Sequence, residues 1–341
     1  MVDQANPNAL PEKPKNSGIP PLTPQVFLRR NALQFGIFGV LVVLWAMFMV
    51  LAPETFLSPR IYASFMATVP FFGLVALPLT MLIIAGEIDL SFPSIMALGV
   101  VAFIQSYELV GNVWIAFAAC LAAGWIAGYL NGVIVVRIGI PSLIATIGTQ
   151  FFWRGFVLVV ENGRSTVLTE PKNTLLGDIL VSRIGNYLPM QMIWFVVIAV
   201  AIWLLLNRHR FGAHVYLIGD NQNSARLMGV QVDRTRTLLF ALTGMVAAFA
   251  GLVASLHVSN FFTTLGEGHL LTTLASVFLG GTSVFGGTGT IIGTFVATFI
   301  IGSINAGIVA VGLTGFWTQL IYGLIVTVSV AMHTILRKRF D

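Results

Sequence analysis

The sequence contains few charged residues and a single cysteine. Asp, Glu, Lys and Arg make up only 9% of the 341 residues, and Cys120 lies inside an apolar run. A lone cysteine excludes an intramolecular disulfide framework. So little charge also excludes an ordinary soluble domain, in which about a quarter of the residues are charged.

Lysine is scarcest of all. None occurs between residues 16 and 171 or between residues 173 and 337, so the chain has no G-x-x-x-x-G-K-[ST] nucleotide-binding loop. The histidines show no metal-ligand spacing, and no serine or cysteine lies in a nucleophile motif. We therefore expect a chain that is not an enzyme and that holds no metal and no cofactor of its own.

Apolar residues dominate what is present. The chain is 57% hydrophobic, and its mean hydropathy is +0.90. Because a membrane-spanning helix needs about 20 mostly apolar residues, we expect an all-α membrane protein, a polytopic bundle of about ten transmembrane helices. The predicted spans are residues 34–52, 61–85, 93–109, 113–136, 142–160, 190–206, 237–257, 270–285, 288–310 and 314–333.

The basic residues predict the orientation. Residues 1–30 form a polar, proline-rich tail ahead of an uncleaved first span, and residues 31–341 form the transmembrane domain, with an outer loop at 161–189 and an inner loop at 207–236. An even number of spans collects most Lys and Arg on one side, which the positive-inside rule assigns to the cytoplasm together with both termini. These inner residues are Lys13, Lys15, Arg29, Arg30, Arg137, Arg208, Arg210, Arg226, Arg234, Arg236, Arg337, Lys338 and Arg339.

Two carboxylates stand at the predicted inner end of the second span, in the stretch IIAGEIDLSFPSIM. Acids inside a membrane are usually functional, so Glu87 and Asp89 could belong to a proton or ion relay. The alternative, which we favour, is structural: Ser91 caps the third helix, Pro93 fits its first turn, and both acids lie beside the positive end of the helix dipole. A second inner junction uses glycines in place of acids: Gly280, Gly281, Gly286 and Gly287.

The inner loop is longer than a helix hairpin needs. Within it, Asp220 or Asn221 can cap a short helix, and Gly229 stands where such a helix would end in the left-handed conformation. The helix could lie on the inner surface of the bundle, or it could dock a cytoplasmic partner. The residues concerned are Asn221, Ser224, Ala225, Arg226, Met228 and Gly229.

Polar and aromatic side chains inside the spans could line a path for an uncharged solute, although interhelical hydrogen bonds are their commoner use. The candidates are Asn131, Gln150, Trp153, Thr272, Ser276 and Asn305. Small residues four apart, Ala123 with Ala127 and Gly124 with Gly128, predict close helix packing.

Five motifs follow one another along the chain: GEIDLS (86–91), NGVIVVRIGIPSLIATIGT (131–149), WRG (153–155), GAHVYLIGDNQNSARLMGV (212–230) and LGGTSVFGGTGTIIGT (279–294). In this order they resemble the motifs of the ribose-type and simple-sugar permeases of bacterial ABC importers. The chain differs where relatives often have Gly-Gly-Ile-Asp or a Glu-Ala-Ala docking sequence; here these are Gly86-Glu87-Ile88-Asp89 and Gln222-Asn223-Ser224.

The resemblance implies a type II ABC importer fold and a permease that imports a monosaccharide or a similar polar solute. It also implies the partners: a second permease copy or paralogue, a periplasmic or lipid-anchored solute-binding protein, and a cytoplasmic ATPase that carries ATP and Mg²⁺ and docks on residues 221–229. The implied location is the bacterial inner membrane. From the residues alone an ion-coupled secondary transporter is the rival, and a membrane enzyme or scaffold has no motif in its favour.

Overall fold

The computed structural model describes the backbone of residues 32–340 except residue 186, and the side chains of residues 34–331 with the same exception. The predicted tail, residues 1–30, lies outside this part. The basic side chains expected near the two ends of the chain lie outside it as well: Lys13, Lys15, Arg29, Arg30, Arg337, Lys338 and Arg339.

Eight helices among the described residues are long and apolar enough to cross a membrane. They are α2 (Ala32–Leu51), α4 (Pro59–Ile84), α5 (Phe92–Val110), α6 (Val113–Val133, continued by the π-helical turn η1, Ile134–Ile138), α7 (Ser142–Val160), α10 (Met190–Asn207), α13 (Val232–Val258) and α15 (Ile291–Ala310). Eight of the ten predicted spans are confirmed, with shifts of up to five residues at their ends. Helix α16 (Phe316–Phe340) coincides with most of the span predicted at 314–333, but its apolar part, Phe316–Ala331, is shorter than the eight, so this crossing stays a prediction. The span predicted at 270–285 differs.

That span is wrong in length. Helix α14 (His269–Leu279) has 11 residues and is about 16 Å long, which is too short to cross a membrane. The helix stops because Gly281 adopts a left-handed φ of +85° directly after it, and residues 280–290 form an irregular turn in which Gly286 and Gly287 also have positive φ. A hydropathy window counted the apolar residues of this turn as helix.

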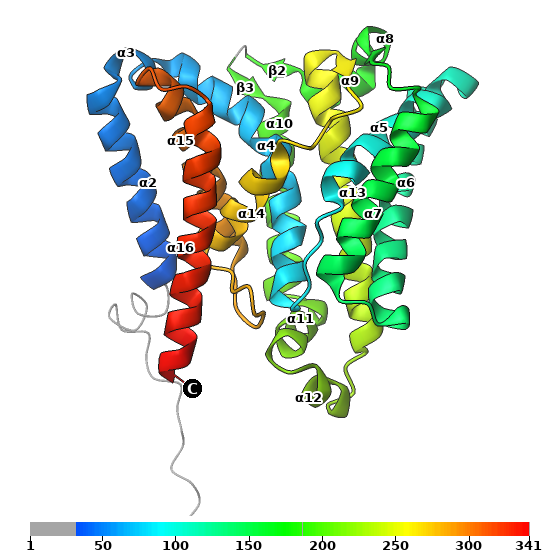
Figure 1. The fold of residues 1–341 in the computed structure, drawn as a ribbon. Helices are drawn as coiled ribbons and strands as arrows, with labels where there is room; N and C mark the ends of the chain where they lie inside the picture. The colour runs from blue at the N-terminus through cyan, green and yellow to red at the C-terminus, as the bar shows by residue number, and fades with distance from the viewer. Residues whose placement is uncertain (1–31, 186, 341) are drawn as a thin grey trace, which may run out of the picture.

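Helices α4 and α13 form the centre of the bundle, and most of their residues are buried. Figure 1 shows α2, α14, α15 and α16 on one side of this centre and α5, α6 and α7 on the other. Helix α6 packs on α13 through glycines: a Cβ on Gly124 would lie 2.4 Å from the Gly244 carbonyl oxygen. The close packing predicted from the small residues at 123–128 is confirmed.

Two segments fold back into the bundle. After α4, residues 85–91 turn back from the lower end and lead into α5, which begins inside the bundle (Figure 1). After α13, residues 259–268 return from the upper end to α14. We call these the first and second re-entrant segments. Each contains a glycine with positive φ, Gly86 (+84°) and Gly266 (+88°).

Short elements close the two ends. The upper end holds α3 (Pro53–Phe56), α8 (Thr169–Lys172), α9 (Leu175–Val181), and two small antiparallel pairs: β1 (Thr166–Val167) with β4 (Asn260–Phe261), and β2 (Arg183–Ile184) with β3 (Leu188–Pro189). The lower end holds α11 (Arg210–Asp220) and α12 (Gln222–Leu227), which project below the bundle (Figure 1).

Candidate functional site

Glu87 forms a buried ion pair with Arg236. The carboxylate in the first re-entrant segment accepts a hydrogen bond from the guanidinium at the start of α13, and the side chains are only 5% and 13% exposed. The pair joins the first re-entrant segment to α13. Glu87 was predicted only to interact with the positive end of the α5 dipole, but it also holds the first re-entrant segment against α13 through this ion pair.

Asp89 is fully buried, and its hydrogen bonds overturn the predicted role of Ser91. Asp89 Oδ1 accepts the Ser91 N–H (2.7 Å) and the Ser91 hydroxyl (2.6 Å), while Ser91 Oγ accepts from Asn131 Nδ2 (2.7 Å). Ser91 has a helical backbone and makes no side-chain capping bond to α5. The prediction was wrong because the carboxylate two residues earlier is a stronger acceptor and forms the local turn itself. Pro93 does lie in the first turn, as expected.

The first re-entrant segment also lies deeper than predicted. Its backbone N–H groups donate to side chains on the first turns of α7, Ile88 to Ser142 Oγ (3.2 Å) and Leu90 to Thr146 Oγ1 (3.1 Å). Asp89 Oδ2 and Asn131 Oδ1 are buried and have no hydrogen-bond partner among the described residues. Asp89 and Ser91 are thus inside the bundle and not at its inner face.

The glycine-rich turn after α14 contacts both the end of α4 and helix α11. A Cβ on Gly219 would lie 1.8 Å from the Ile84 carbonyl oxygen and 2.5 Å from the Gly287 nitrogen. The Gly287 N–H donates to the same Ile84 oxygen (2.9 Å), and the Tyr216 hydroxyl donates to the Gly289 oxygen (2.9 Å). The end of α4, the turn after α14 and helix α11 therefore form a single close backbone contact, which we call the lower junction. Of the predicted glycines, Gly286 and Gly287 belong to it, while Gly280 packs against α15.

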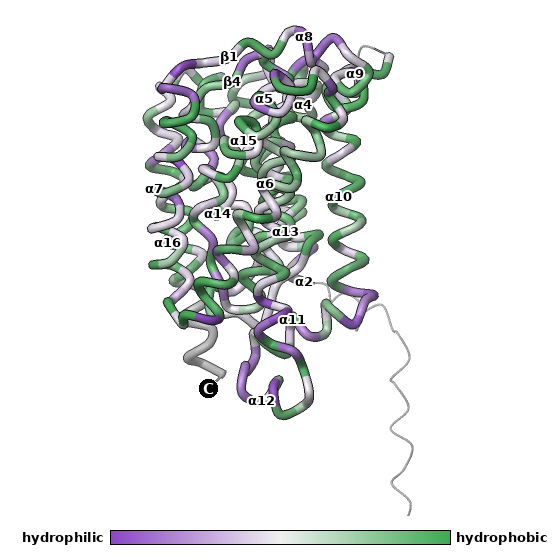
Figure 2. The backbone as a smooth tube through the Cα atoms, turned by 90° about the vertical axis from the view of Figure 1, so that its right-hand side faces the viewer, coloured by the Kyte–Doolittle hydropathy of each residue, from purple (hydrophilic) through white to green (hydrophobic). Residues whose placement is uncertain are grey.

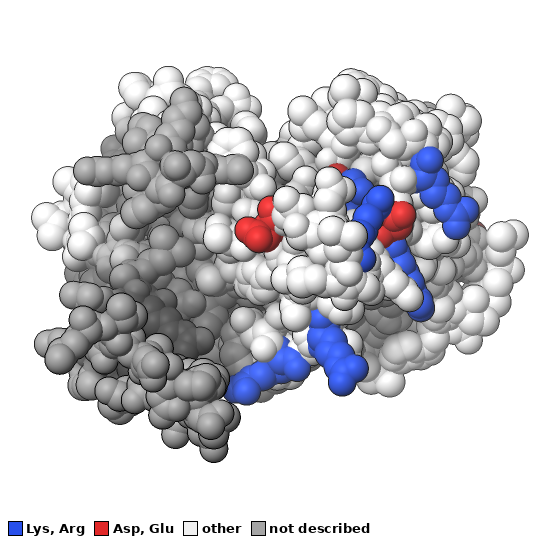
Figure 3. Space-filling model, turned by 90° about the horizontal axis from the view of Figure 1, so that it is seen from below, with Lys and Arg blue, Asp and Glu red and all other residues white. Residues whose placement is uncertain are grey.

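The short helix α12 forms where the sequence predicts it. Asn221 caps it by accepting the Ser224 N–H (2.9 Å), and Gly229 has φ +81° after the helix ends. Ala225 is buried against the loop, whereas Ser224, Arg226 and Met228 are exposed, and Leu227 is 90% exposed. Figure 3 shows basic side chains gathered on this lower face; the exposed ones are Arg137, Arg208, Arg210, Arg226 and Arg234.

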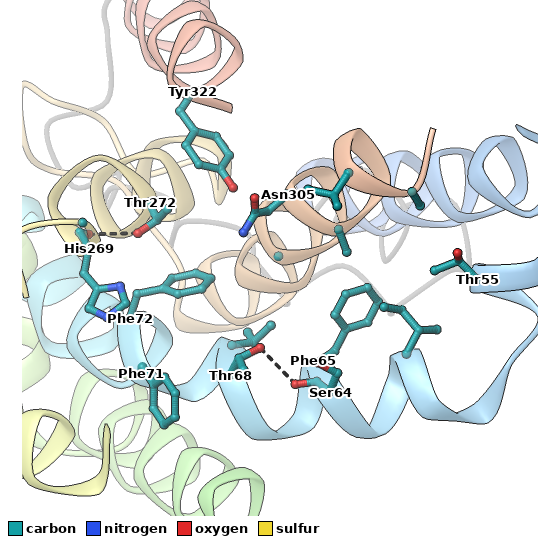
Figure 4. A pocket seen from close by; sticks show the side chains of 17 residues that line it. Thr55, Ser64, Phe65, Thr68, Phe71, Phe72, His269, Thr272, Asn305 and Tyr322 are labelled. Atoms are coloured by element: carbon teal, nitrogen blue, oxygen red, sulfur yellow. Dashed lines mark hydrogen bonds between the residues drawn. The ribbon is translucent and has the colours of Figure 1, made fainter. Parts of the chain in front are cut away.

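A pocket of about 650 Å³ lies between α4, α14, α15 and α16 (Figure 4). Two residues of the predicted path, Thr272 and Asn305, line it, and Figure 4 shows them facing the same space as His269 and Tyr322. Aromatic rings such as Phe72 form much of the wall, and none of the lining residues is Asp, Glu, Lys or Arg. The pocket offers neutral hydrogen-bonding groups and apolar ring faces.

The other predicted path residues lie elsewhere. Ser276 is buried and donates to the Thr272 carbonyl oxygen, Asn131 belongs to the Asp89 cluster, and Gln150 and Trp153 are half-buried on α7. Sequence reasoning missed His269, Tyr322 and the pair Ser64 and Thr68. Ser64 and Thr68 are one helical turn apart in an apolar span, and that spacing is a signal that could have found them.

Arg154 was also missed as a structural residue. Its guanidinium donates to the backbone oxygens of Thr263, Leu265 (2.8 Å) and Pro93 (3.2 Å), and lies 3.6 Å from the Glu267 carboxylate. One side chain on α7 therefore binds the second re-entrant segment and the start of α5 together.

These features define a class: a multi-pass membrane permease with broken helices around a neutral pocket. Residues 61–330 match the family described as "Branched-chain amino acid transport system / permease component", and the chain belongs to this family. The ribose import permease protein RbsC of Escherichia coli (strain K12) is 31% identical over 296 residues, 85% of this chain and 90% of that protein.

Two further relatives agree. The ribose import permease protein RbsC of Bacillus subtilis (strain 168) is 31% identical over 282 residues, which are 82% of this chain and 86% of that protein. The autoinducer 2 import system permease protein LsrD of Yersinia enterocolitica is 32% identical over 252 residues, 70% and 73% of the two chains. The predicted resemblance to ribose-type permeases of ABC importers is confirmed, as are the all-α polytopic fold and a multi-pass place in the inner membrane.

Proposed function

We propose that this chain imports a monosaccharide or a similar small polar solute as the membrane subunit of an ATP-binding-cassette importer. The similarity to ribose and autoinducer 2 import permeases supports this. The pocket supports it as well, because neutral donors and acceptors beside aromatic rings suit a solute with many hydroxyl groups and no charge.

A cytoplasmic ATPase docks on α12 and supplies the energy. Leu227 and Met228 are exposed apolar residues on a helix that projects from the bundle, and such residues favour a protein partner over water. ATP and Mg²⁺ are held by that ATPase, and this chain catalyses no reaction and binds no cofactor. The lower face with its basic residues is then cytoplasmic, and so are both termini.

A second permease copy or paralogue completes the path. Helices α7 and α16 carry exposed aromatic residues, including Phe151 (72% exposed) and Phe316 (86% exposed), on faces that a second copy would cover. A solute-binding protein delivers the solute at the upper end, where the predicted outer loop forms α8, α9 and β1. The paired permeases alternate between outward-open and inward-open states, and ATP shifts the balance only if the ATPase binds one state more tightly.

An ion-coupled transporter would need acids deep in the membrane as well as broken helices. Asp89 is buried, but it is held in a cluster with Ser91 and Asn131, and re-entrant segments suit either kind of transporter, so neither feature favours ion coupling. Membership of the family favours the importer function, because the named relatives are permease components of import systems.

Cross-linking tests the docking site directly. Cys120 is the only cysteine in the sequence, so a Cys120→Ala background leaves an introduced cysteine as the only thiol. We expect Leu227→Cys to form a cross-link with the ATPase, whereas Val167→Cys, which is exposed at the upper end, gives none. Equal cross-linking at the two positions would contradict the proposal.

Arg226 and Gly229 are predicted to transmit the signal from the ATPase. Arg226 pairs with Asp233 at the start of α13, and Gly229 holds a left-handed turn in which alanine is strained. We expect the Arg226→Ala/Gly229→Ala double variant to keep its fold and lose most ATP-driven uptake. Full docking and uptake in this variant would show that the two residues have no part in coupling.

A further inference from the structure

An apolar groove of about 280 Å³ runs between α10 and α15 on the outside of the bundle. Val196, Ala199, Val200 and Trp203 line it from α10, and Ile291, Ile292 and Phe295 line it from α15. Phe195 stacks on Phe295 with ring centroids 4.6 Å apart, so the groove extends from this contact towards the lower end of both helices.

The groove faces the surroundings of the bundle and not its core. Val200 is 51% exposed and Ile292 is 45% exposed, whereas Ala199 is buried and forms the floor. In a chain that spans a membrane, an apolar groove on this side is in contact with lipid chains. Ala199 leaves room for the groove because it has only a methyl group, whereas Val196, Val200 and Trp203 beside it carry larger side chains.

Two arginines, Arg208 and Arg210, lie near the lower end of the groove. The guanidinium of Arg208 lies 5.9 Å from the centre of the Trp203 ring, which is part of the groove wall. Arg210 is two residues further on, both arginines are exposed, and neither has a carboxylate partner within the described part of the chain. Figure 2 shows α10 as a hydrophobic helix that ends in a hydrophilic segment at this point.

Helix α15 adds to this charge. It begins at Ile291 and Ile292, which line the lower part of the groove, so the positive end of its dipole lies at the same end as the arginines. The groove therefore has two parts, an apolar wall and an end with exposed guanidinium groups and a tryptophan at the membrane boundary. A phospholipid with an anionic headgroup matches both, because its acyl chain suits the apolar wall and its headgroup suits the guanidinium groups.

We propose that this groove is a binding site for an anionic phospholipid. One acyl chain lies along Val196, Ala199, Val200 and Ile292, and the phosphate is held by Arg208 and Arg210. The site is distinct from the neutral pocket between α4 and α16, and the inference does not depend on the docking of an ATPase or on the identity of the solute.

Titration of the purified, delipidated protein with phosphatidylglycerol and phosphatidylcholine of identical chains tests the headgroup. Native mass spectrometry reads the occupancy. We expect phosphatidylglycerol to bind saturably and at least tenfold more tightly than phosphatidylcholine. A basic residue near a membrane surface contributes about fivefold in affinity, so Arg208→Gln weakens binding about fivefold and Arg208→Gln/Arg210→Gln about 25-fold.

The control variant is Arg137→Gln, because Arg137 is exposed on the same lower face but lies at a different hollow, between η1 and α13, whereas Arg208 lies against the groove residue Trp203. It leaves the affinity unchanged within twofold if the site is specific. Equal affinity for the two lipids would overturn the proposal, and so would equal effects of Arg137→Gln and Arg208→Gln, because these indicate general attraction to a basic surface.

The acyl chain is tested separately with phosphatidylglycerol whose chains carry bromine, which quenches a tryptophan in contact with them. Because the chain has six other tryptophans, the readout is the difference between two proteins. We expect a saturable part of the quenching in the wild type to be lost in Trp203→Phe, a variant that keeps an aromatic ring in the wall. Glycerol phosphate, which has the headgroup without chains, does not compete at equal concentration. Quenching that is identical in the wild type and Trp203→Phe would show that no chain occupies the groove.

Discussion

Glu87 and Arg236 bring two opposite charges into a region where water is excluded. An ion pair of this kind adds little to stability as a whole, but it leaves one charge unpaired when the other is removed. Its position, between the first re-entrant segment and the start of α13, means that it holds the first re-entrant segment against the central helix.

We predict that Glu87→Ala lowers the free energy of unfolding by about 3–5 kcal/mol, because Arg236 then remains buried without a partner. The exposed pair Arg226 and Asp233 supplies the control, and Asp233→Ala costs less than about 1 kcal/mol. Unfolding in detergent measures both. The Glu87→Ala/Arg236→Ala double variant loses less than the sum of the single variants, and strict additivity would argue against a direct pair.

Gly219 is a second residue on which the lower junction depends. A methyl group there would overlap the Ile84 carbonyl oxygen, so we predict that Gly219→Ala destabilises the protein by about 1–3 kcal/mol and impairs uptake. Gly39→Ala is the matched control because no atom lies within 4 Å of the added Cβ. If the two alanine variants had the same melting temperature and uptake, α11 would not pack on α4 as described.

Single residues were the least predictable part of this protein. The acidic pair was found from the sequence, but Ser91 was assigned as a cap because the competing acceptor, Asp89, is visible only once its geometry is known. Arg154 entered the sequence analysis only as part of the WRG motif (153–155). Nothing in its neighbours along the chain indicates that it binds the oxygens of Thr263 and Leu265, which are more than 100 positions away.

At the scale of elements, the two re-entrant segments distinguish this bundle from a set of simple hairpins. Each allows a helix, α5 or α14, to begin inside the bundle, and Arg154 on α7 binds both the second segment and the first turn of α5. A movement of α7 would therefore carry both broken helices with it.

We predict that Arg154→Gln separates these elements. The variant loses hydrogen bonds in which the donor is charged, each worth about 1.5–3 kcal/mol, so its melting temperature and its uptake both fall. Arg154→Lys retains the charge but cannot reach several carbonyl oxygens at once, and it recovers only part of the loss. Arg164→Gln, at an exposed position near the same end, is the control and behaves as the wild type.

Most membrane-spanning helices could be predicted because a long apolar run is enough to identify them. The predicted ranges for α4, α7 and α10 were nearly correct. The exception is α14. The stretch 270–285 contains no charged residue, and its mean hydropathy does not distinguish an irregular turn buried inside a protein from a helix. Only the glycines at 280, 281, 286 and 287 signal the break, and they were interpreted as a junction after the helix and not as its early end.

At the scale of the whole molecule, the lower junction connects the proposed docking helix with the neutral pocket. Helix α11 contacts the end of α4 and the turn after α14, and both of these helices line the pocket. Force applied at α12 can therefore reach the pocket walls through contacts between backbones, which deform less than contacts between long side chains. The chain has this connection but no nucleotide-binding loop of its own.

Uptake of radiolabelled solute into proteoliposomes measures whether this chain depends on an ATPase. We predict uptake when the permease, the ATPase, the solute-loaded binding protein and ATP are all present, and none when the ATPase is omitted. Accumulation by the permease alone, driven by a Na⁺ or H⁺ gradient, would contradict this prediction.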